Sequence, residues 1–365
     1  MKLIKPMKLV TGIFLTTILL LISACSNLGY YAQSASGQLD VINRTVPIQS
    51  LLDQPGTDPA LKTRLQLVLQ IRDFASSELA LPDNDSYRSY ADLERPYAIW
   101  NVFAAPPLSL ESTRWCFPFA GCVSYKGYFN EQDAKDFAAE LKKQGQDVYV
   151  AGISAYSTLG WFDDPMLNTI INRYDPELAG LIFHELAHQQ VYVQDDTEFN
   201  ESFAMTIELA GTKSWLDSIN KDKQNSEKIY RDFVTRKKRR LQFVELVMET
   251  REKLATVYQA DIADNEKLIQ KAAVIKTLRK QYATIRKTWQ GYPGYDKWFG
   301  SEINNAKLGS IGTYHRFVPA FKKLLAKEKS FGDFYQAVAK LSKLEKAERH
   351  TALDDLTRSP RPASE

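Results

Sequence analysis

The chain has 365 residues, of which 44% are hydrophobic and 12% aromatic, and its formal net charge is +3. This length and composition exclude an intrinsically disordered protein and suffice for one large or two modest domains. The positive excess belongs to Lys2, Lys5 and Lys8, so removal of residues 1–24 leaves a net charge of 0. The mature charge balance therefore gives no indication of a nucleic-acid partner.

The N-terminus has the layout of a lipoprotein signal peptide. The three lysines precede an apolar run, GIFLTTILLLISAC, which is short for a transmembrane helix and ends in small residues. The ending ISAC resembles the bacterial lipobox, which implies cleavage of residues 1–24 and lipidation of Cys25; an ordinary signal peptide with a chance cysteine is the alternative. By resemblance to Gram-negative lipoproteins, Ser26 favours the outer membrane, facing the periplasm. We expect residues 25–57 to form the lipid anchor and a tether.

The remaining residues, 58–365, predict a single α+β domain. A helix is indicated over residues 58–80 by apolar residues three and four apart. Residues 97–162 are rich in aromatic and β-branched residues and predict a small mixed sheet with a helix over 130–145. From residue 175 to about 345 the pattern is almost entirely helical. We expect the small sheet to pack on this mostly helical body.

Three helices can be bounded in the helical part. The first is expected to begin with Asp175 as its cap and to end near Val193. The second should begin near residues 195–197 and end near Gly211. Residues 226–289 predict a long antiparallel helical pair with a break near Asp261–Asn265. The basic run KKRR, residues 237–240, is interpreted as a solvated helix face and not as a nucleic-acid patch.

Two cysteines of the mature chain lie close together in the segment WCFPFAGC. Cys116 and Cys122 are separated by five residues that include a proline and a glycine. Disulfides persist in exported proteins, so we expect these cysteines to form a bridge. Free buried thiols and metal ligands are the alternatives.

The segment HELAH contains His184, Glu185 and His188 and matches the H-E-x-x-H pattern. On a helix, residues four apart lie one above the other, so both imidazoles can bind one Zn²⁺ ion at about 2.0–2.1 Å. Glu185 lies about 100° around the axis from His184 and can reach a water molecule beside the metal without binding the ion. Two ordinary core histidines are the alternative. The pattern therefore predicts a zinc site with Glu185 as general base.

A catalytic zinc site needs a third protein ligand, and a downstream carboxylate fits that place. Asp195 and Asp196 have the position of helix caps, and Glu198 fits a capping box. Glu201 lies one turn into the second helix and would face the histidines if that helix returns antiparallel. We predict Glu201 as the third ligand, with Glu198 next, and Glu208 as a carboxylate that orients one of the histidines.

Several motifs together resemble a known family. The Asn200-Glu201 pair after the H-E-x-x-H helix is similar to the N-E pair of the gluzincin metallopeptidases, although the spacing is shorter and Met205 stands where those enzymes carry an acid. The ISAC ending, GCVSYKGYF, AYSTLGWFDDP, HELAHQ, FNESFA and NNAKLGSIGTYHRFVPAF resemble a bacterial family of exported putative aminopeptidases. The resemblance covers most of the mature chain. It implies a zinc metallopeptidase with one Zn²⁺ per chain and a peptide substrate.

Two tyrosines are candidates for further roles. Metallopeptidases often use a Tyr, His or Arg to stabilise the oxyanion of the reaction, and Tyr314 is our candidate, with core packing as the alternative. Tyr156 lies in a strand-like segment before the metal helix, where a strand edge could bind an extended peptide. Plain sheet packing is the alternative.

The sequence thus predicts zinc-dependent peptide hydrolysis at the periplasmic face of a membrane. Glu185 would take a proton from water and pass it to the leaving amine. Two other functions are compatible with the same residues: a zinc hydrolase acting on a non-peptide bond, and a non-catalytic envelope protein with a vestigial metal site. The intact Glu185 speaks against the second, since a purely structural site has no use for this carboxylate.

Overall fold

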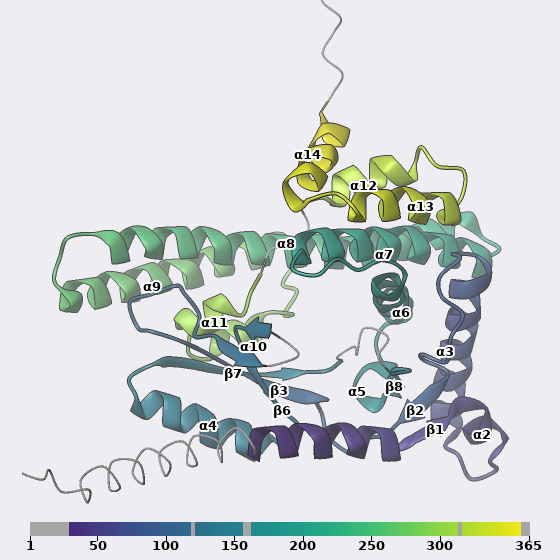
Figure 1. Ribbon diagram of the computed structural model, residues 1–365, viewed down its shortest axis with the longest axis horizontal. Coiled ribbons are helices and arrows are strands. Elements are labelled where there is room, and N and C mark those ends of the chain that lie inside the picture. Colours follow the sequence, from purple (N-terminus) through teal and green to yellow (C-terminus); the bar gives the residue numbers. More distant parts are fainter. Residues whose placement is uncertain (1–28, 118–120, 156–161, 313–315, 359–365) are drawn as a thin grey trace, which may run out of the picture.

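Small sheets and long helices form an α+β fold in which the helices dominate (Figure 1). The computed structural model describes residues 29–117, 121–155, 162–312 and 316–358. As predicted, the sheet-containing part packs against a mostly helical body. Strands also occur outside residues 97–162. Three short strands from separate parts of the chain form another sheet there.

The described strands form three sheets. The first, in the order β1-β2-β8, is mixed, with β1 antiparallel and β8 parallel to β2. The second, in the order β6-β3-β7, is antiparallel throughout, and β4 and β5 form a separate antiparallel pair. The bounds are β1 Thr45–Pro47, β2 Ser89–Ala91, β3 Ile99–Ala105, β4 Trp115–Phe117, β5 Gly121–Val123, β6 Lys126–Tyr128, β7 Asp147–Ile153 and β8 Met166–Leu167.

The segment before the predicted helix over 58–80 differs from the expected tether. Residues 29–43 are helical, β1 pairs with β2, and helix α2 (Ile48–Asp53) follows. Val41 and Ile48 are buried in the main core, so apolar contacts hold this segment to the domain. Helix α3 (Pro59–Ser77) then begins as predicted, with the Asp58 side chain accepting a hydrogen bond from the Leu61 amide.

The antiparallel sheet is covered by α4 (Glu131–Lys143), whose Asn130 side chain caps the first turn as predicted. A disulfide joins Cys116 in β4 to Cys122 in β5, where the two residues are directly paired. Helix α4 lies below the sheet at the lower left in Figure 1.

Two antiparallel helices, α6 (Asp175–Gln190) and α7 (Thr197–Ile219), form the centre of the main core. The short α5 (Asn168–Ile171) precedes them. Tyr174 stands at the N-cap of α6 in place of the predicted Asp175, because the Asp175 carboxylate pairs with Arg64 at 2.5 Å. Helix α7 continues past Gly211, since this glycine serves packing: a Cβ atom there would lie 2.7 Å from Leu79 Cδ1.

The predicted long helical pair is present as α8 (Lys223–Gln259) and α9 (Asp264–Thr288), with the break at the expected place. The pair extends along the molecule above the antiparallel sheet (Figure 1). Lys271 of α9 contacts the Asp147 carboxylate at the start of β7 at 2.5 Å. The Asn305 side chain donates to the backbone carbonyls of Pro106, Pro107 and Ser109. The Lys271 contact joins the pair to the sheet, and the Asn305 contacts join the region of α11 (Asn305–Gly309) to the segment after β3.

The C-terminal part is more helical than predicted. Beyond α10 (Asp296–Gly300) and α11 (Asn305–Gly309) lie α12 (Val318–Leu325), α13 (Phe331–Ser342) and α14 (Lys346–Thr357), which extends the helical region past residue 345. These last three helices form a layer on the outer side of α7 (Figure 1). Among the described residues, no helix combines the length and hydrophobicity that crossing a bilayer requires.

Candidate metal centre

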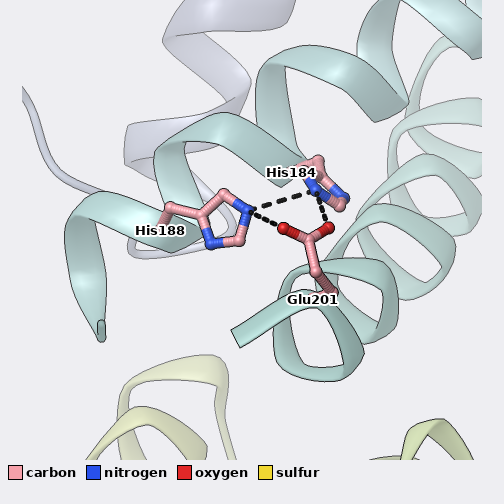
Figure 2. A group of neighbouring side chains, drawn as sticks. All are labelled: His184, His188 and Glu201. Atoms are coloured by element: carbon pink, nitrogen blue, oxygen red, sulfur yellow. Dashed lines mark hydrogen bonds and ion pairs between the residues drawn. The ribbon is translucent and has the colours of Figure 1, made fainter. Parts of the chain in front are cut away.

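Three side chains from α6 and α7 converge on one point (Figure 2). His184 and His188 project from consecutive turns of α6, and Glu201 projects toward them from α7. His184 Nε2 lies 3.2 Å from His188 Nε2 and 3.3 Å from Glu201 Oε2, and His188 Nε2 lies 3.5 Å from Glu201 Oε1. The predicted ligands are thus brought together.

These separations fit a tetrahedral metal ion. Bonds of about 2.0–2.1 Å to the corners of a tetrahedron place neighbouring ligand atoms about 3.3–3.4 Å apart. The observed distances between the three residues range from 3.2 to 3.5 Å. Two imidazole nitrogens and a carboxylate oxygen also match the donor types that Zn²⁺ accepts. The residues can therefore hold a metal ion with one coordination position left open.

The turn between α6 and α7 fixes the position of Glu201. The Asn200 side chain accepts a hydrogen bond from the Val193 amide at 2.9 Å and donates one to the Val193 carbonyl at 2.7 Å. Asp195 has a positive φ of 61°, which turns the chain sharply, and Asp196 caps α7 by accepting from the Phe199 amide. Helix α6 ends at Gln190, earlier than predicted, because this turn needs residues 191–196.

Residues of α14, in the C-terminal helical layer, hold the Asp196 cap in place. Asp196 is 1% exposed, and its carboxylate contacts the guanidinium of Arg349 and the imidazole of His350. Glu198, the alternative third ligand, has one oxygen 4.0 Å from Arg316 and does not belong to the group of three. The structure therefore separates Glu198 from the histidines and places Glu201 beside them.

Glu208 is positioned to orient His184. One of its oxygens lies 3.3 Å from His184 Nδ1, on the side of the ring opposite Nε2, and the other pairs with Lys237 of α8. Gly180 leaves space for this arrangement, since a Cβ atom there would lie 2.9 Å from Glu208 Cγ. A carboxylate behind a ligating histidine fixes the direction of the ring and increases its basicity. Lys237, expected on a solvated face, thus takes part in the site.

The carboxylates make the site attractive to a cation. Burial would lower the pKa of His184, but Glu201 and Glu208 raise it to about 10. Burial would raise the pKa of Glu208, but Lys237 and His184 lower it to about 2, and the two histidines hold the pKa of Glu201 below its usual range. The same negative charges that stabilise a protonated imidazole would stabilise a divalent ion in its place.

Glu185 lies beside the ligands without belonging to the group. Burial raises its pKa, while the two histidines act in the opposite direction. Tyr87 and Asp164 lie near enough to interact with it electrostatically. Tyr87 is a buried tyrosine in the left-handed region with φ of 62°, and its amide donates to the Asp164 carbonyl at 2.7 Å. Tyr87 belongs to none of the sequence motifs, whereas Asp164 lies within AYSTLGWFDDP, and both reach Glu185 only through the fold.

A cavity of about 350 Å³ opens beside the ligands. Its walls come from α6, α7, α8 and the segment after α9. The lining residues are Arg173, Glu177, Leu181, His184, Glu185, Glu201, Met205, Glu208, Arg236, Lys237, Arg240, Tyr292 and Tyr295. Tyr292 and Tyr295 are hydroxyl-bearing residues of the cavity that sequence reasoning missed. Tyr314, Tyr156 and Cys25 lie outside the described residues and stay predictions.

Comparison with known proteins agrees with the motifs. No curated protein and no solved structure matches the chain. A family model described as "Putative aminopeptidase" matches residues 29–353, which include the whole metal centre and the walls of the cavity. The description suggests a peptidase that acts on peptide substrates. On this match, which spans most of its length, the chain belongs to the putative aminopeptidase family.

Proposed function

We propose that the protein is a zinc-dependent metallopeptidase that hydrolyses peptides. The observation that carries this proposal is the convergence of His184, His188 and Glu201 at tetrahedral spacing, with Glu185 beside them and an open cavity in front. When bound, the ion would polarise a water molecule and the carbonyl of the scissile bond. The family description, "Putative aminopeptidase", supports the further proposal that the enzyme removes N-terminal residues.

Each residue of the site has its own proposed role. His184, His188 and Glu201 would hold the ion, and Glu208 would hold His184 in the ligating orientation. The Glu185 carboxylate would accept a proton from water and deliver it to the nitrogen of the leaving amine. Its place on α6 beside the ligands, among the residues that line the cavity, supports this role.

Metal analysis together with a peptide panel tests the proposal. We expect residues 26–365, purified without chelators, to contain about one zinc ion per chain, as the set of three ligands requires. His188→Ala should lose both the metal and the hydrolysis of peptides. Peptides with a free N-terminus should be cleaved faster than N-acetylated ones if the enzyme is an aminopeptidase. A wild-type chain that neither contains zinc nor takes it up would contradict the proposal.

We propose further that the protein is anchored to the cell envelope, in the outer membrane and facing the periplasm, by lipid on Cys25. The proposal is supported by the lipobox-like sequence. Cys25→Ser should release the protein from membranes or block its processing, because the lipid would be the anchor. Membrane fractionation and mass spectrometry of both forms give the answer. An unchanged distribution and mass would exclude lipid at this cysteine.

A further inference from the structure

Cationic side chains gather on one side of the cavity beside the metal centre. Four cationic side chains line it: Arg173 in the turn before α6, and Arg236, Lys237 and Arg240 on α8. The positions on α8 are one, three and four residues apart, so one side of this helix presents all three. These residues belong to a basic run that would otherwise be assigned to solvent.

Two of the four cations already have partners. Lys237 pairs with the Glu208 carboxylate, and Arg236 Nη1 lies 3.7 Å from Glu177 Oε1. Within the part of the chain that the structure describes, the guanidinium groups of Arg173 and Arg240 have no hydrogen bond and no ion pair. Two arginines therefore face the cavity with their donors free.

The acidic side chains of the cavity are all engaged. Glu201 belongs to the metal ligands, and Glu208 is held by His184 and Lys237. Glu177 pairs with Arg236, and Glu185 is the proposed base. Glu177, Glu185 and Glu208 act on Arg173 through space, but among the described lining residues no carboxylate lies within ion-pair distance of Arg173 or Arg240. The cavity is thus better equipped to receive an anion than an additional cation.

The two arginines also repel each other. Burial lowers the pKa of Arg173, Glu177 raises it, and the positive charge of Arg240 lowers it again, while Glu208 and Glu185 raise it. A guanidinium group nevertheless stays charged in proteins. Arg173 is half-buried and Arg240 is exposed, and an anion bound at both guanidinium groups would offset the repulsion between them.

We infer that Arg173 and Arg240 form an anion subsite that binds a carboxylate of the substrate next to the metal centre. The planar guanidinium group binds carboxylates through paired hydrogen bonds, which suits a fixed orientation. A cavity of about 350 Å³ accommodates a short peptide segment. The carboxylate could be the C-terminus of a short peptide or an acidic side chain. The inference rests on the proposed peptidase function for the identity of the substrate.

Measurements of peptide binding at equilibrium test this inference independently of catalysis. The zinc-loaded Glu185→Gln variant is titrated calorimetrically with trialanine and with its C-terminal amide, so that peptides bind without being consumed. We expect the free acid to bind about 10- to 100-fold more tightly than the amide, the gain typical of hydrogen bonds to charged groups. In a second pair of C-terminal amides, a peptide with a central glutamate is compared with its glutamine counterpart.

Substitution of the arginines gives the decisive comparison. Arg173→Gln and Arg240→Gln, each added to Glu185→Gln, should abolish the preference for the carboxylate, while Arg173→Lys should retain part of it. Arg231→Gln is the matched control, since Arg231 is exposed on α8 and does not line this cavity. A preference in the first peptide pair identifies the C-terminus as the group recognised, and a preference in the second identifies an acidic side chain.

The outcomes distinguish the two proposals. Preferential binding of a carboxylate that depends on both arginines supports the subsite even if the wild-type protein cleaves no peptide, in which case the peptidase function fails alone. Equal binding of acid and amide in both pairs overturns the subsite. A preference that persists in Arg173→Gln and Arg240→Gln also overturns it, because another group must then bind the carboxylate.

Discussion

Glu185→Gln should reduce peptide hydrolysis by at least about 100-fold and leave the zinc content unchanged. Glutamine keeps the shape of the side chain but cannot take a proton from water. The metal should stay, because His184, His188 and Glu201 form the group of ligands and Glu185 lies outside it. The measurements are kcat on a cleaved peptide and zinc per chain by elemental analysis.

Glu249→Gln is a suitable control for this experiment. Glu249 is an exposed glutamate of α8 that does not line the cavity, and its substitution removes the same charge. We expect this variant to retain the wild-type rate. Near-normal turnover in Glu185→Gln would show that the H-E-x-x-H segment does not act as a peptidase site in this protein.

Glu201→Ala should weaken zinc binding and hydrolysis together. Loss of a carboxylate behind a ligand typically costs 10- to 100-fold in metal affinity, so loss of a direct ligand should cost at least about 100-fold. The affinity is measured by competition with a chelator of known strength. The rate should recover in excess zinc only to the extent that the metal returns, because Glu201 has no other role in the proposal.

Glu198→Ala is the matched control on the same helix. Glu198 lies near Arg316 at 4.0 Å and outside the group of ligands, so its removal should leave zinc affinity unchanged. The opposite result, with zinc lost in Glu198→Ala and retained in Glu201→Ala, would assign the third ligand to Glu198 and leave the role of Glu185 intact.

The metal centre could be predicted from sequence because it is local. The spacing of His184 and His188 determines that both lie on one face of a helix. A short turn between two apolar helices favours an antiparallel return, which brings Glu201 back to the histidines. The Asn200-Glu201 pair is a motif of the sequence. The two hydrogen bonds between the Asn200 side chain and the Val193 backbone cannot be predicted from it.

The walls of the cavity could not be predicted, because they depend on contacts between distant segments. Lys237 reaches Glu208 only when α8 lies against α7, and a solvated helix face gives a similar pattern of charges. A glycine such as Gly211 predicts the end of a helix, but here it lies inside α7. Close packing against Leu79 and Phe183 explains why the residue is a glycine. The helix over residues 29–43 follows a signal-like segment, and polar residues there suggested a tether.

The metal centre and the opposite wall of the cavity come from different parts of the chain, so substrate selectivity can change during evolution while the metal centre stays the same. The ligands and the base come from one helical hairpin, His184 to Glu201, whereas the opposite wall comes from α8 and from Tyr292 and Tyr295. Apart from Lys237, which holds Glu208, substitutions in that wall leave the reacting groups in place. Relatives could therefore exchange one substrate for another while the hydrolytic centre stays the same, and an engineer could alter selectivity on α8 without rebuilding the metal site.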